Sequence, residues 1–433
     1  MKIFPDISTV VENNLCFSCG ACLPVCQPDS ISFHFTPAGR LHPRVDFDTC
    51  THCGVCFAVC PGLDPKNRVL GNLDTDPFEG PVVNAYVGRT LNQKVYRNSQ
   101  SGGVVTEVLS YLFAENLITH ALLVKSEFSL RPRHSCYLAQ NIDEATLAQK
   151  SKYIPLDILS ALQNIKEIKG DIAVVGLPCQ IEGVVSLQKQ NPRQFGKIKY
   201  KLGLICDGVL SNLASEYFVQ GVIGEHRIIY KNKDIPSYIH ANVTVQRKDN
   251  PKDIVISSRE RFLLKELTTP PRCHACFDKM NFHADLVFGD PWGVEGYDQQ
   301  HGDSIVVSRN TLGQGIIDAL LRQTRASLEK IDYDIVLKGQ RIDLKRAKVF
   351  ETYSAYKKLG FVVPSYVEAL KMYAKKPTTW NAKKTLEKFL SLEQKTNEQN
   401  LRFISARLRT IKTKDRVKGL LKKIFLTKYW YKK

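Results

Sequence analysis

Between about residue 81 and about residue 342, short runs of β-branched and other apolar residues alternate with longer stretches of helical periodicity. The pattern predicts strands at 120–126, 171–177, 198–206, 253–258, 284–290 and 304–309, and helices at 101–116 and 311–324. Strand-length apolar runs that interleave with helices are typical of α/β architecture. We therefore predict a central α/β domain over residues 80–345, although the pattern gives no strand order.

The first 70 residues have a different pattern, an internal repeat in which one cysteine run is followed by a connector and then by a second run. In the connector, residues 30–48, apolar and polar residues alternate on both sides of Pro37-Ala38-Gly39, which predicts a β-hairpin. Residues 64–81 are rich in Pro, Gly, Asn and Asp and are predicted to be a linker. The fold class expected for the whole chain is thus α+β / α/β, with a small N-terminal domain over residues 1–70.

The third region, residues 346–433, is predicted to be helical and is increasingly basic. From Leu401 to Lys433 there are twelve Lys or Arg and one acid, Asp415, so this tail supplies 12 − 1 = +11 of the net charge of +18. Apolar residues recur there at helical spacing from Val417 to Phe425, and Trp430 follows. Two interpretations remain open, a solvated helix and a peripheral anchor on an anionic membrane surface. No nucleic-acid motif accompanies the charge, so no nucleic-acid partner is expected.

Composition narrows the class of protein. With 43% hydrophobic and 24% charged residues the chain resembles an ordinary globular protein. Its start shows no secretory signal pattern, and no run of 18 apolar residues occurs, so we expect a cytoplasmic protein, which would lie at the inner face of the membrane if the tail is an anchor. In that compartment, thirteen closely spaced cysteines favour metal ligation over disulfide bonds.

Eight of the cysteines form two runs of the pattern Cys-x-x-Cys-x-x-Cys-x-x-x-Cys. Three cysteines spaced by two residues can surround one corner of a [4Fe-4S] cluster, and the small residues Gly20, Ala21 and Gly54 let the backbone approach it. In two-cluster ferredoxins the fourth cysteine of each run binds the other cluster. This rule assigns one cluster to Cys16, Cys19, Cys22 and Cys60, and the other to Cys50, Cys53, Cys56 and Cys26. The alternative is a pair of structural zinc sites, although zinc ribbons usually offer paired cysteines and not runs of four.

Six ordered segments of the chain resemble one known family, that of the coenzyme F420 hydrogenase/dehydrogenase beta subunit. They are GPVVNAYVGR, RNSQSGGVVTEVLSYL, SKYIP, VVGLPCQIEG, LGLICDG and PRCHACFDKMNFHADLVFGDPWG. The resemblance covers about residues 10–345 and leaves the tail unexplained. It implies an FAD-containing oxidoreductase in which iron–sulfur clusters exchange electrons with the flavin. Members include deazaflavin-reducing subunits of hydrogenases and formate dehydrogenases, and others reduce chlorophyll-type pigments.

Four further cysteines could form a third metal site: Cys179, Cys206, Cys273 and Cys276. Their spacing alone leaves open a third iron–sulfur cluster, a four-cysteine zinc site and unligated buried thiols. The family resemblance favours the cluster. The thirteenth cysteine, Cys136, is expected to bind no metal.

The resemblance also suggests where FAD binds. Glycines that open a predicted helix suit a phosphate, because free backbone amides and the helix dipole attract an anion. We assign the loop Ser99-Gln-Ser101-Gly102-Gly103, at the start of the helix predicted at 101–116, to the FAD pyrophosphate or its surroundings. Ser151, Lys152 and Tyr153 are assigned to the flavin, where the lysine could stabilise a reduced anionic ring. Asp290 and Trp292, after the strand predicted at 284–290, could face the flavin or the substrate. The predicted cofactor residues are Ser101, Gly102, Gly103, Thr106, Ser151, Lys152, Tyr153 and Asp290; no catalytic residue is singled out.

These observations lead to one main hypothesis and two alternatives. The main hypothesis is a flavin-dependent reductase that takes electrons from a donor such as ferredoxin, passes them through [4Fe-4S] clusters to FAD, and reduces a small organic two-electron acceptor. The flow could run in reverse, and coenzyme F420 is one candidate acceptor. The alternatives are a non-catalytic subunit that relays electrons between a partner enzyme and a carrier, and a structural zinc protein.

Overall fold

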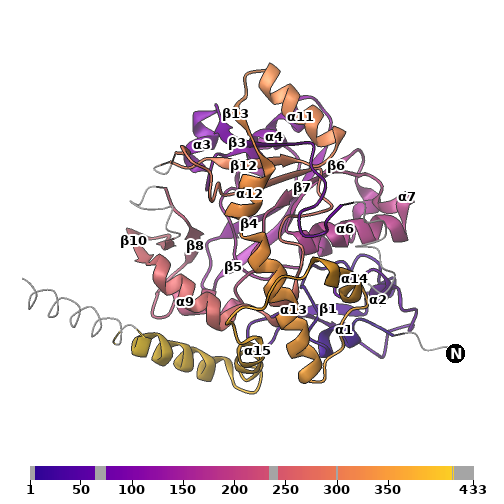
Figure 1. Ribbon diagram of the computed structural model, residues 1–433, viewed down its shortest axis with the longest axis vertical. Helices are drawn as coiled ribbons and strands as arrows, with labels where there is room; N and C mark the ends of the chain where they lie inside the picture. The colour runs from indigo at the N-terminus through magenta and orange to yellow at the C-terminus, as the bar shows by residue number, and fades with distance from the viewer. Residues whose placement is uncertain (1–4, 64–74, 234–241, 299–300, 412, 414–433) are drawn as a thin grey trace, which may run out of the picture.

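An eight-stranded mixed sheet forms the centre of the computed structural model, which describes residues 5–63, 75–233, 242–298, 301–411 and 413 (Figure 1). The strand order is β13-β3-β12-β11-β7-β6-β4-β5, and the four inner strands β11, β7, β6 and β4 are parallel. The strands of this sheet are β3 (Asn84–Thr90), β4 (His120–Glu127), β5 (Arg133–Ala139), β6 (Ile172–Gly176), β7 (Ile198–Leu204), β11 (Leu286–Gly289), β12 (Ser304–Ser308) and β13 (Ala326–Ile331). The predicted α/β architecture of the central region is confirmed.

Five of the six predicted strands lie in this sheet, as β4, β6, β7, β11 and β12. The sixth, at 253–258, overlaps β10 (Asn250–Ile256), which belongs to a separate antiparallel sheet with β9 (Val243–Arg247) and β8 (His226–Tyr230). Antiparallel strands β5, β3 and β13, which the pattern did not predict, extend the parallel core at its two edges.

Helices cover both faces of the central sheet. Successive side chains of a strand point to opposite faces, and in β4 Leu123 packs with α4 (Val104–Ala114) and α11 (Thr311–Arg322), whereas Leu122 packs on the other side with α6 (Pro178–Gln190) and η1 (Ile158–Leu162). Both predicted helices, at 101–116 and 311–324, are confirmed as α4 and α11. The remaining central helices are α3 (Gln93–Asn98), α5 (Ile142–Thr146), η2 (Ile165–Glu167), α7 (Pro192–Phe195), α8 (Asn212–Phe218), α9 (Ser258–Thr268) and α10 (Pro271–Ala275).

The N-terminal module packs directly on the central domain, beside α6 and η1 (Figure 1). It consists of α1 (Ser8–Glu12), β1 (Ile31–Phe35), β2 (Leu41–Val45) and α2 (Val55–Ala58), and the antiparallel pair β1–β2 confirms the predicted hairpin. The backbone N–H of Leu159 donates to the carbonyl of Cys19 at 3.0 Å. Gly20 has φ +86°, and a Cβ there would lie 2.6 Å from the Asp157 carbonyl oxygen, so only glycine allows this approach.

The prediction of a linker over residues 64–81 is wrong for residues 75–81, because this described part packs into the core. Phe78 is fully buried against Phe277 and Phe350, and Arg346 pairs with Asp76 at 2.6 Å. Residues 64–74 lie outside the described residues.

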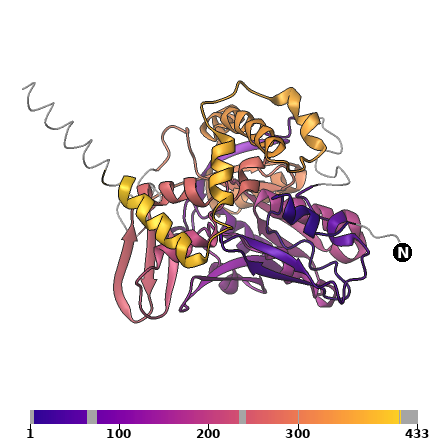
Figure 2. The ribbon, with the colours of Figure 1, turned by 90° about the horizontal axis from the view of Figure 1, so that it is seen from below.

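The C-terminal region is helical, as predicted, and follows α12 (Tyr333–Gly339), the last helix of the central region. Its elements are α13 (Ile342–Lys358), α14 (Tyr366–Leu370), η4 (Lys371–Tyr373), α15 (Ala382–Leu390) and a helix over 397–411. Figure 2 shows this last helix (yellow) beside the β8–β10 sheet, where Ile404 and Leu408 share a core with Val243. Because α13 begins at Ile342, the predicted border at residues 345 and 346 falls inside a helix.

The apolar stripe from Val417 to Phe425 and Trp430 lie outside the described residues, so membrane contact through the tail stays a prediction. Within the described part of the chain, no helix has both the length and the apolar character that crossing a membrane requires.

A buried ion pair ties α4 to the edge of the sheet and offers a test of the fold. The carboxylate of Glu107, only 2% exposed, accepts from Thr90 Oγ1 at 2.7 Å and from Arg325 Nε at 2.7 Å. Glu107→Ala leaves both donors without this acceptor, so we expect the free energy of unfolding to fall by about 2–4 kcal/mol, measured by urea denaturation. As a control, Glu398→Ala breaks the ion pair between Glu398 and Arg402, whose two side chains are 73% and 77% exposed. This substitution should change the free energy of unfolding by less than about 0.5 kcal/mol. Equal effects of the two variants would contradict this assignment.

Candidate redox site

A cavity of about 270 Å³ opens where the parallel strands β6, β7 and β11 end. Its walls include Gly176, Leu204 and Gly289 from the carboxyl ends of these strands. Ligands of open α/β sheets bind at this edge. The cavity is also lined by seven of the eight predicted cofactor residues: Ser101, Gly103, Thr106, Ser151, Lys152, Tyr153 and Asp290.

The eighth predicted residue, Gly102, is not part of the cavity wall but is packed behind it. Its N–H donates to Ser304 Oγ at 2.9 Å, and a Cβ there would lie 2.3 Å from the Gly88 carbonyl oxygen. The role of Gly102 is therefore to let the loop pack closely on β3 and β12. Gly103, with φ +76°, precedes the first turn of α4 and presents that helix terminus to the cavity.

Asp290 anchors the loop that contains Ser101. Its carboxylate accepts from Ser101 Oγ at 2.7 Å and forms an ion pair with Lys231, a buried residue that the sequence did not single out. Burial alone would raise the pKa of Asp290, but the Lys231 ammonium and the Ser101 hydroxyl hold this pKa below its ordinary value. Asp290 is thus ionised at neutral pH and holds Ser101 in place.

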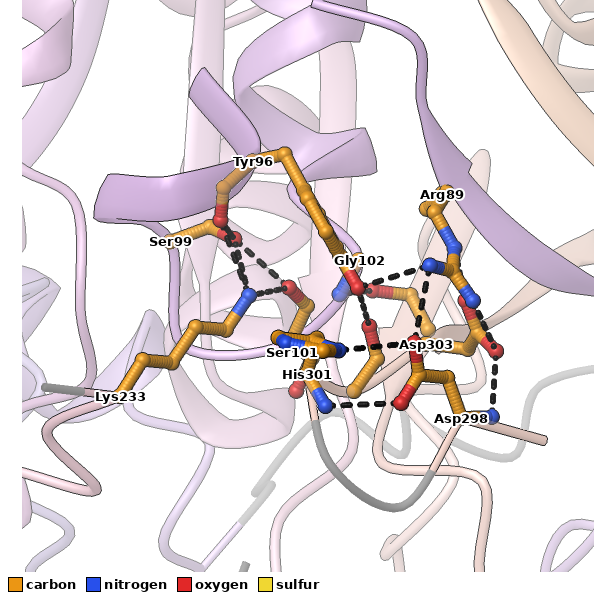
Figure 3. A network of polar contacts seen from close by, with 11 residues as sticks. Arg89, Tyr96, Ser99, Ser101, Gly102, Lys233, Asp298, His301 and Asp303 are labelled. Carbon is orange, nitrogen blue, oxygen red and sulfur yellow. Dashed lines mark hydrogen bonds and ion pairs between the residues drawn. The ribbon is translucent and has the colours of Figure 1, made fainter. Parts of the chain in front are cut away.

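A second polar network holds the same loop from its other side (Figure 3). Lys233 Nζ donates to the backbone carbonyls of Tyr96 and Ser101, at 2.9 and 2.7 Å. Arg89 donates to the Tyr96 hydroxyl at 3.0 Å and pairs with Asp303 at 2.7 Å. Because these residues come from separate elements, no local sequence signal marked them as one network.

Lys152 also lines the cavity, next to Ser151, whose N–H donates to Gln100 Oε1 of this loop at 2.9 Å. Its Nζ donates to the backbone carbonyls of Ala148, Gln149 and Lys150, at 2.6, 3.0 and 2.8 Å. Burial, together with the charge of Lys150, lowers the pKa of Lys152 to about 7. Lys152 therefore holds a turn of the cavity wall, in addition to any contact with a bound group.

The two N-terminal cysteine runs share one backbone conformation. The left-handed positions are Ser18 and Gly20 in the first run, and His52 and Gly54 at the same places in the second. These turns direct backbone N–H groups at sulfur. The N–H of Ser18 lies 3.3 Å from Cys16 Sγ, and that of His52 lies 3.4 Å from Cys50 Sγ. The internal repeat seen in the sequence is thus a structural repeat.

The thiols of these runs gather in the predicted groups. Cys16, Cys19, Cys22 and Cys60 line one small cavity, which we call the inner thiol group. Burial raises the pKa of Cys22 well above its ordinary value, and the charges of the other three thiolates raise it further. Cys26 lies among the second set, because its pKa is raised by burial and by the charges of Cys50 and Cys53. We call Cys26, Cys50, Cys53 and Cys56 the outer thiol group, since Cys53 is the one exposed cysteine among the described residues.

The four remaining predicted ligands come from distant segments that the fold brings close, since the Cys206 N–H donates to the Lys279 carbonyl at 3.0 Å and a Cβ on Gly208 would lie 3.4 Å from Cys273 Cβ. Cys179 begins α6, Cys206 follows β7, Cys273 lies in α10 and Cys276 follows it. Burial raises the pKa of Cys179, and the charges of Cys19, Cys276, Cys206 and Cys273 raise it further. We call this set the central thiol group. Cys136 lies apart from it, on β5.

Three observations place these groups in a continuous row. Cys22 and Cys60 of the inner group belong to one buried cluster, and Cys26, Cys50 and Cys56 of the outer group pack against it. Gly183, four residues after Cys179 on α6, would place a Cβ 3.6 Å from Cys19 Sγ, which links the inner group to the central group. Cys206 lines the large cavity.

The donor sets fit [4Fe-4S] clusters in number and type, because each cluster takes four thiolates and each iron binds one of them. Among the described residues, no three His, Cys, Asp or Glu side chains gather closely enough to bind a single metal ion.

Comparisons with protein families match three parts of the chain. Residues 85–163 match the N-terminal model of the coenzyme F420 hydrogenase/dehydrogenase beta subunit, and residues 170–334 match its C-terminal model. Residues 15–62 match the 4Fe-4S dicluster domain.

Two curated proteins and one solved structure are similar to the chain. A coenzyme F420-dependent sulfite reductase of Methanocaldococcus jannaschii is 26% identical over 363 residues, which cover 79% of this chain and 51% of the relative. The chain thus spans about half the length of that enzyme. A subunit of the F(420)H(2) dehydrogenase of Methanosarcina mazei is 25% identical over 366 residues, covering 79% of this chain and 92% of the relative. A chain of the F420-reducing [NiFe] hydrogenase complex of Methanosarcina barkeri shares the fold, with a TM-score of 0.51 and 16% identity over 66% of this chain and 96% of that one.

The low pKa of Lys152 gives the stability of the protein a defined pH dependence. Because this pKa is about 7 in the folded state, against an ordinary value of 10.5, the unfolded chain binds a proton between these values that the folded chain does not. The free energy of unfolding should therefore rise with pH from 7 towards 10, by at most about 1.4 kcal/mol per unit. Urea titrations at several pH values should show this slope reduced in Lys152→Met and unchanged in Lys383→Met, which removes an exposed lysine. A slope that persists in Lys152→Met would contradict the assignment.

Proposed function

This chain belongs to the family of the coenzyme F420 hydrogenase/dehydrogenase beta subunit and has an N-terminal 4Fe-4S dicluster domain, and we propose how it works as an oxidoreductase of that family. The outer, inner and central thiol groups would hold [4Fe-4S] clusters, which would accept single electrons from a donor such as a ferredoxin. The large cavity would hold FAD, which would supply the two-electron reduction of a small organic acceptor. The direction can reverse with the potentials of donor and acceptor.

The observation that carries this proposal is the continuous row of thiol groups that ends at the cavity. Cys19 of the inner group lies against α6, which begins with Cys179 of the central group, since a Cβ on Gly183 of this helix would lie 3.6 Å from Cys19 Sγ, and Cys206 of the central group lines the cavity. A structural zinc protein has no need for such a row, since separate zinc sites stabilise a fold without being neighbours. Contiguous redox centres are what single-electron transfer requires.

The residues of the cavity support FAD as the group it holds. Gly103 and the first turn of α4 offer backbone amides to a pyrophosphate, and Ser101 is fixed beside them by Asp290. Apolar side chains such as Leu109 and Phe288 line other parts of the wall, as a flavin ring system requires. FAD supplies the step between one-electron and two-electron transfer, which clusters alone do not perform readily.

The relatives support a class of acceptor, because they include a coenzyme F420-dependent sulfite reductase and a subunit of an F(420)H(2) dehydrogenase. We propose a deazaflavin of the F420 type as the first candidate. A relay role within a larger assembly is the second candidate. It is favoured by the exposed Cys53, which offers a contact point at the outer group, and by the likeness in fold to a chain of a hydrogenase complex.

The number of clusters tests the row of thiol groups. Protein purified without oxygen should contain about twelve irons, with matching sulfide, and one FAD per chain. Cys206→Ser should lower the iron to about eight and slow flavin reduction by a one-electron donor, whereas Cys136→Ser should retain all of it. About eight irons in the unmodified protein would remove the central cluster from the proposal, and a colourless protein would remove its redox function.

The glycine at the helix terminus tests the FAD site. A Cβ on residue 103 would lie 2.9 Å from Thr90 Cγ2 at a backbone φ of +76°, so Gly103→Ala distorts the loop at the start of α4. We expect FAD affinity to fall at least about tenfold, which is about 1.4 kcal/mol, with iron content unchanged. Gly315→Ala is the matched control, because a Cβ there meets nothing within 4 Å. Full FAD retention in Gly103→Ala would place the cofactor elsewhere.

A further inference from the structure

Arg272 is a buried cation at the junction of the three regions of the chain. Its side chain is held by four neutral oxygen atoms and is 2% exposed as a residue. Nη1 donates to the Tyr353 hydroxyl at 2.7 Å and to the Ala275 carbonyl at 3.3 Å. Nη2 donates to the Tyr366 hydroxyl at 2.7 Å and to the Gly62 carbonyl at 3.0 Å.

These contacts place the guanidinium between two thiol groups. Gly62 follows the inner group by two residues, and the guanidinium carbon lies 4.1 Å from the ring centroid of Phe17, which follows Cys16. Ala275 lies between Cys273 and Cys276 of the central group.

The buried charge calls for an anionic partner. Phenols and backbone carbonyls solvate a guanidinium but do not neutralise it, and Arg272 Nε is buried with no hydrogen-bond partner among the described atoms. A [4Fe-4S] cluster with four thiolate ligands carries a net negative charge, which increases on reduction. Clusters at the inner and central groups would supply that charge on both sides of the arginine.

We propose that Arg272 is a positioning residue for electron transfer between these two clusters, and that Tyr353 and Tyr366 hold it there. This rests on the proposed function. The transfer would move one electron from a reduced cluster at the inner group to an oxidised cluster at the central group, with no bond formed or broken. Because the cation stabilises the reduced, more negative state of each cluster, it would raise both reduction potentials together and make both clusters easier to reduce, with little change in the driving force between them.

The proposal gives the C-terminal helices a role in this transfer. Tyr353 lies in α13 and Tyr366 in α14, both beyond residue 334, where the family match ends. Their hydroxyls are 3.1 Å apart and both contact Arg272. The α13–α14 segment therefore forms part of the path between the two clusters, although it contributes no ligand.

A buried carboxylate of opposite sign lies at the same junction. Glu182 is buried on α6, three residues after Cys179 of the central group, and its neighbour Gly183 would place a Cβ 3.6 Å from Cys19 Sγ of the inner group. Arg272 and Glu182 thus act on the same two groups in opposite directions. Removing either charge should shift the cluster potentials with opposite sign, which a general loss of packing would not do.

The test is a redox titration of the full chain, purified without oxygen and followed by electron paramagnetic resonance, with iron measured in each sample. Arg272→Met should lower the potentials of the inner and central clusters, and Glu182→Gln should raise them. Arg272→Lys should restore part of the loss, because it keeps the charge without the planar fork. Tyr353→Phe with Tyr366→Phe should lower the same potentials by a smaller amount. The outer cluster is the internal control.

Three results would overturn the inference. About twelve irons with unchanged potentials in Arg272→Met and Glu182→Gln would remove Arg272 from electron transfer and leave the proposed function intact. Shifts of the same sign in both variants would mark a packing effect. If Arg272→Met loses its clusters, the test rests on Glu182→Gln and on the double variant Tyr353→Phe with Tyr366→Phe. Unchanged cluster potentials in these two variants would remove the proposal. About eight irons in the unmodified protein would instead contradict the proposed function itself.

Discussion

Burial of cysteine sulfur is the constraint on which the rest of this structure depends. Burial raises the pKa of Cys16 and Cys206 to about 11, and that of Cys19 to about 12, so these thiolates are stable only with compensating positive charge or metal. The chain offers compensation at short range through backbone N–H groups aimed at sulfur. At longer range it offers Arg272, which is enclosed by parts of all three regions. The N-terminal module, the sheet edge and the C-terminal helices meet around Arg272, next to the buried cysteines that need positive charge.

The same sheet edge organises the large cavity. Parallel strands β6 and β7 end side by side, so Cys206 of the central group and the cavity wall arise from the same short segment. The loop before α4 closes the cavity from the neighbouring β3. It is held on one side by Asp290 with Lys231, and on the other by Lys233. A cofactor in this cavity would therefore contact a wall whose loop is held by ion pairs and hydrogen bonds. It would also lie next to Cys206.

How much could be predicted from the sequence depended on how local each signal was. The two cysteine runs and the hairpin between them could be located from spacing alone, because their residues are close in the chain. The central group needed the family resemblance, since Cys179 and Cys276 come from segments almost a hundred residues apart. Lys231 and Arg272 gave no signal, because their importance comes from contacts with Asp290 and with two tyrosines far along the chain. Among the strands, β3, β5 and β13 were missed because polar residues interrupt their apolar pattern, and Phe78 was hidden in a segment with the composition of a linker.

Two glycines at the interface between the N-terminal module and the central domain determine how closely the inner thiol group approaches that domain. Gly20 allows the inner thiol loop to touch the backbone at Asp157, and Gly183 of α6 lies close enough that a Cβ there would be 3.6 Å from Cys19 Sγ. Electron tunnelling rates fall exponentially with the distance between redox centres. If the thiol groups hold clusters as proposed, a single methyl group at either glycine would act as a spacer and would slow the transfer between the inner and central groups without removing a ligand or a charge.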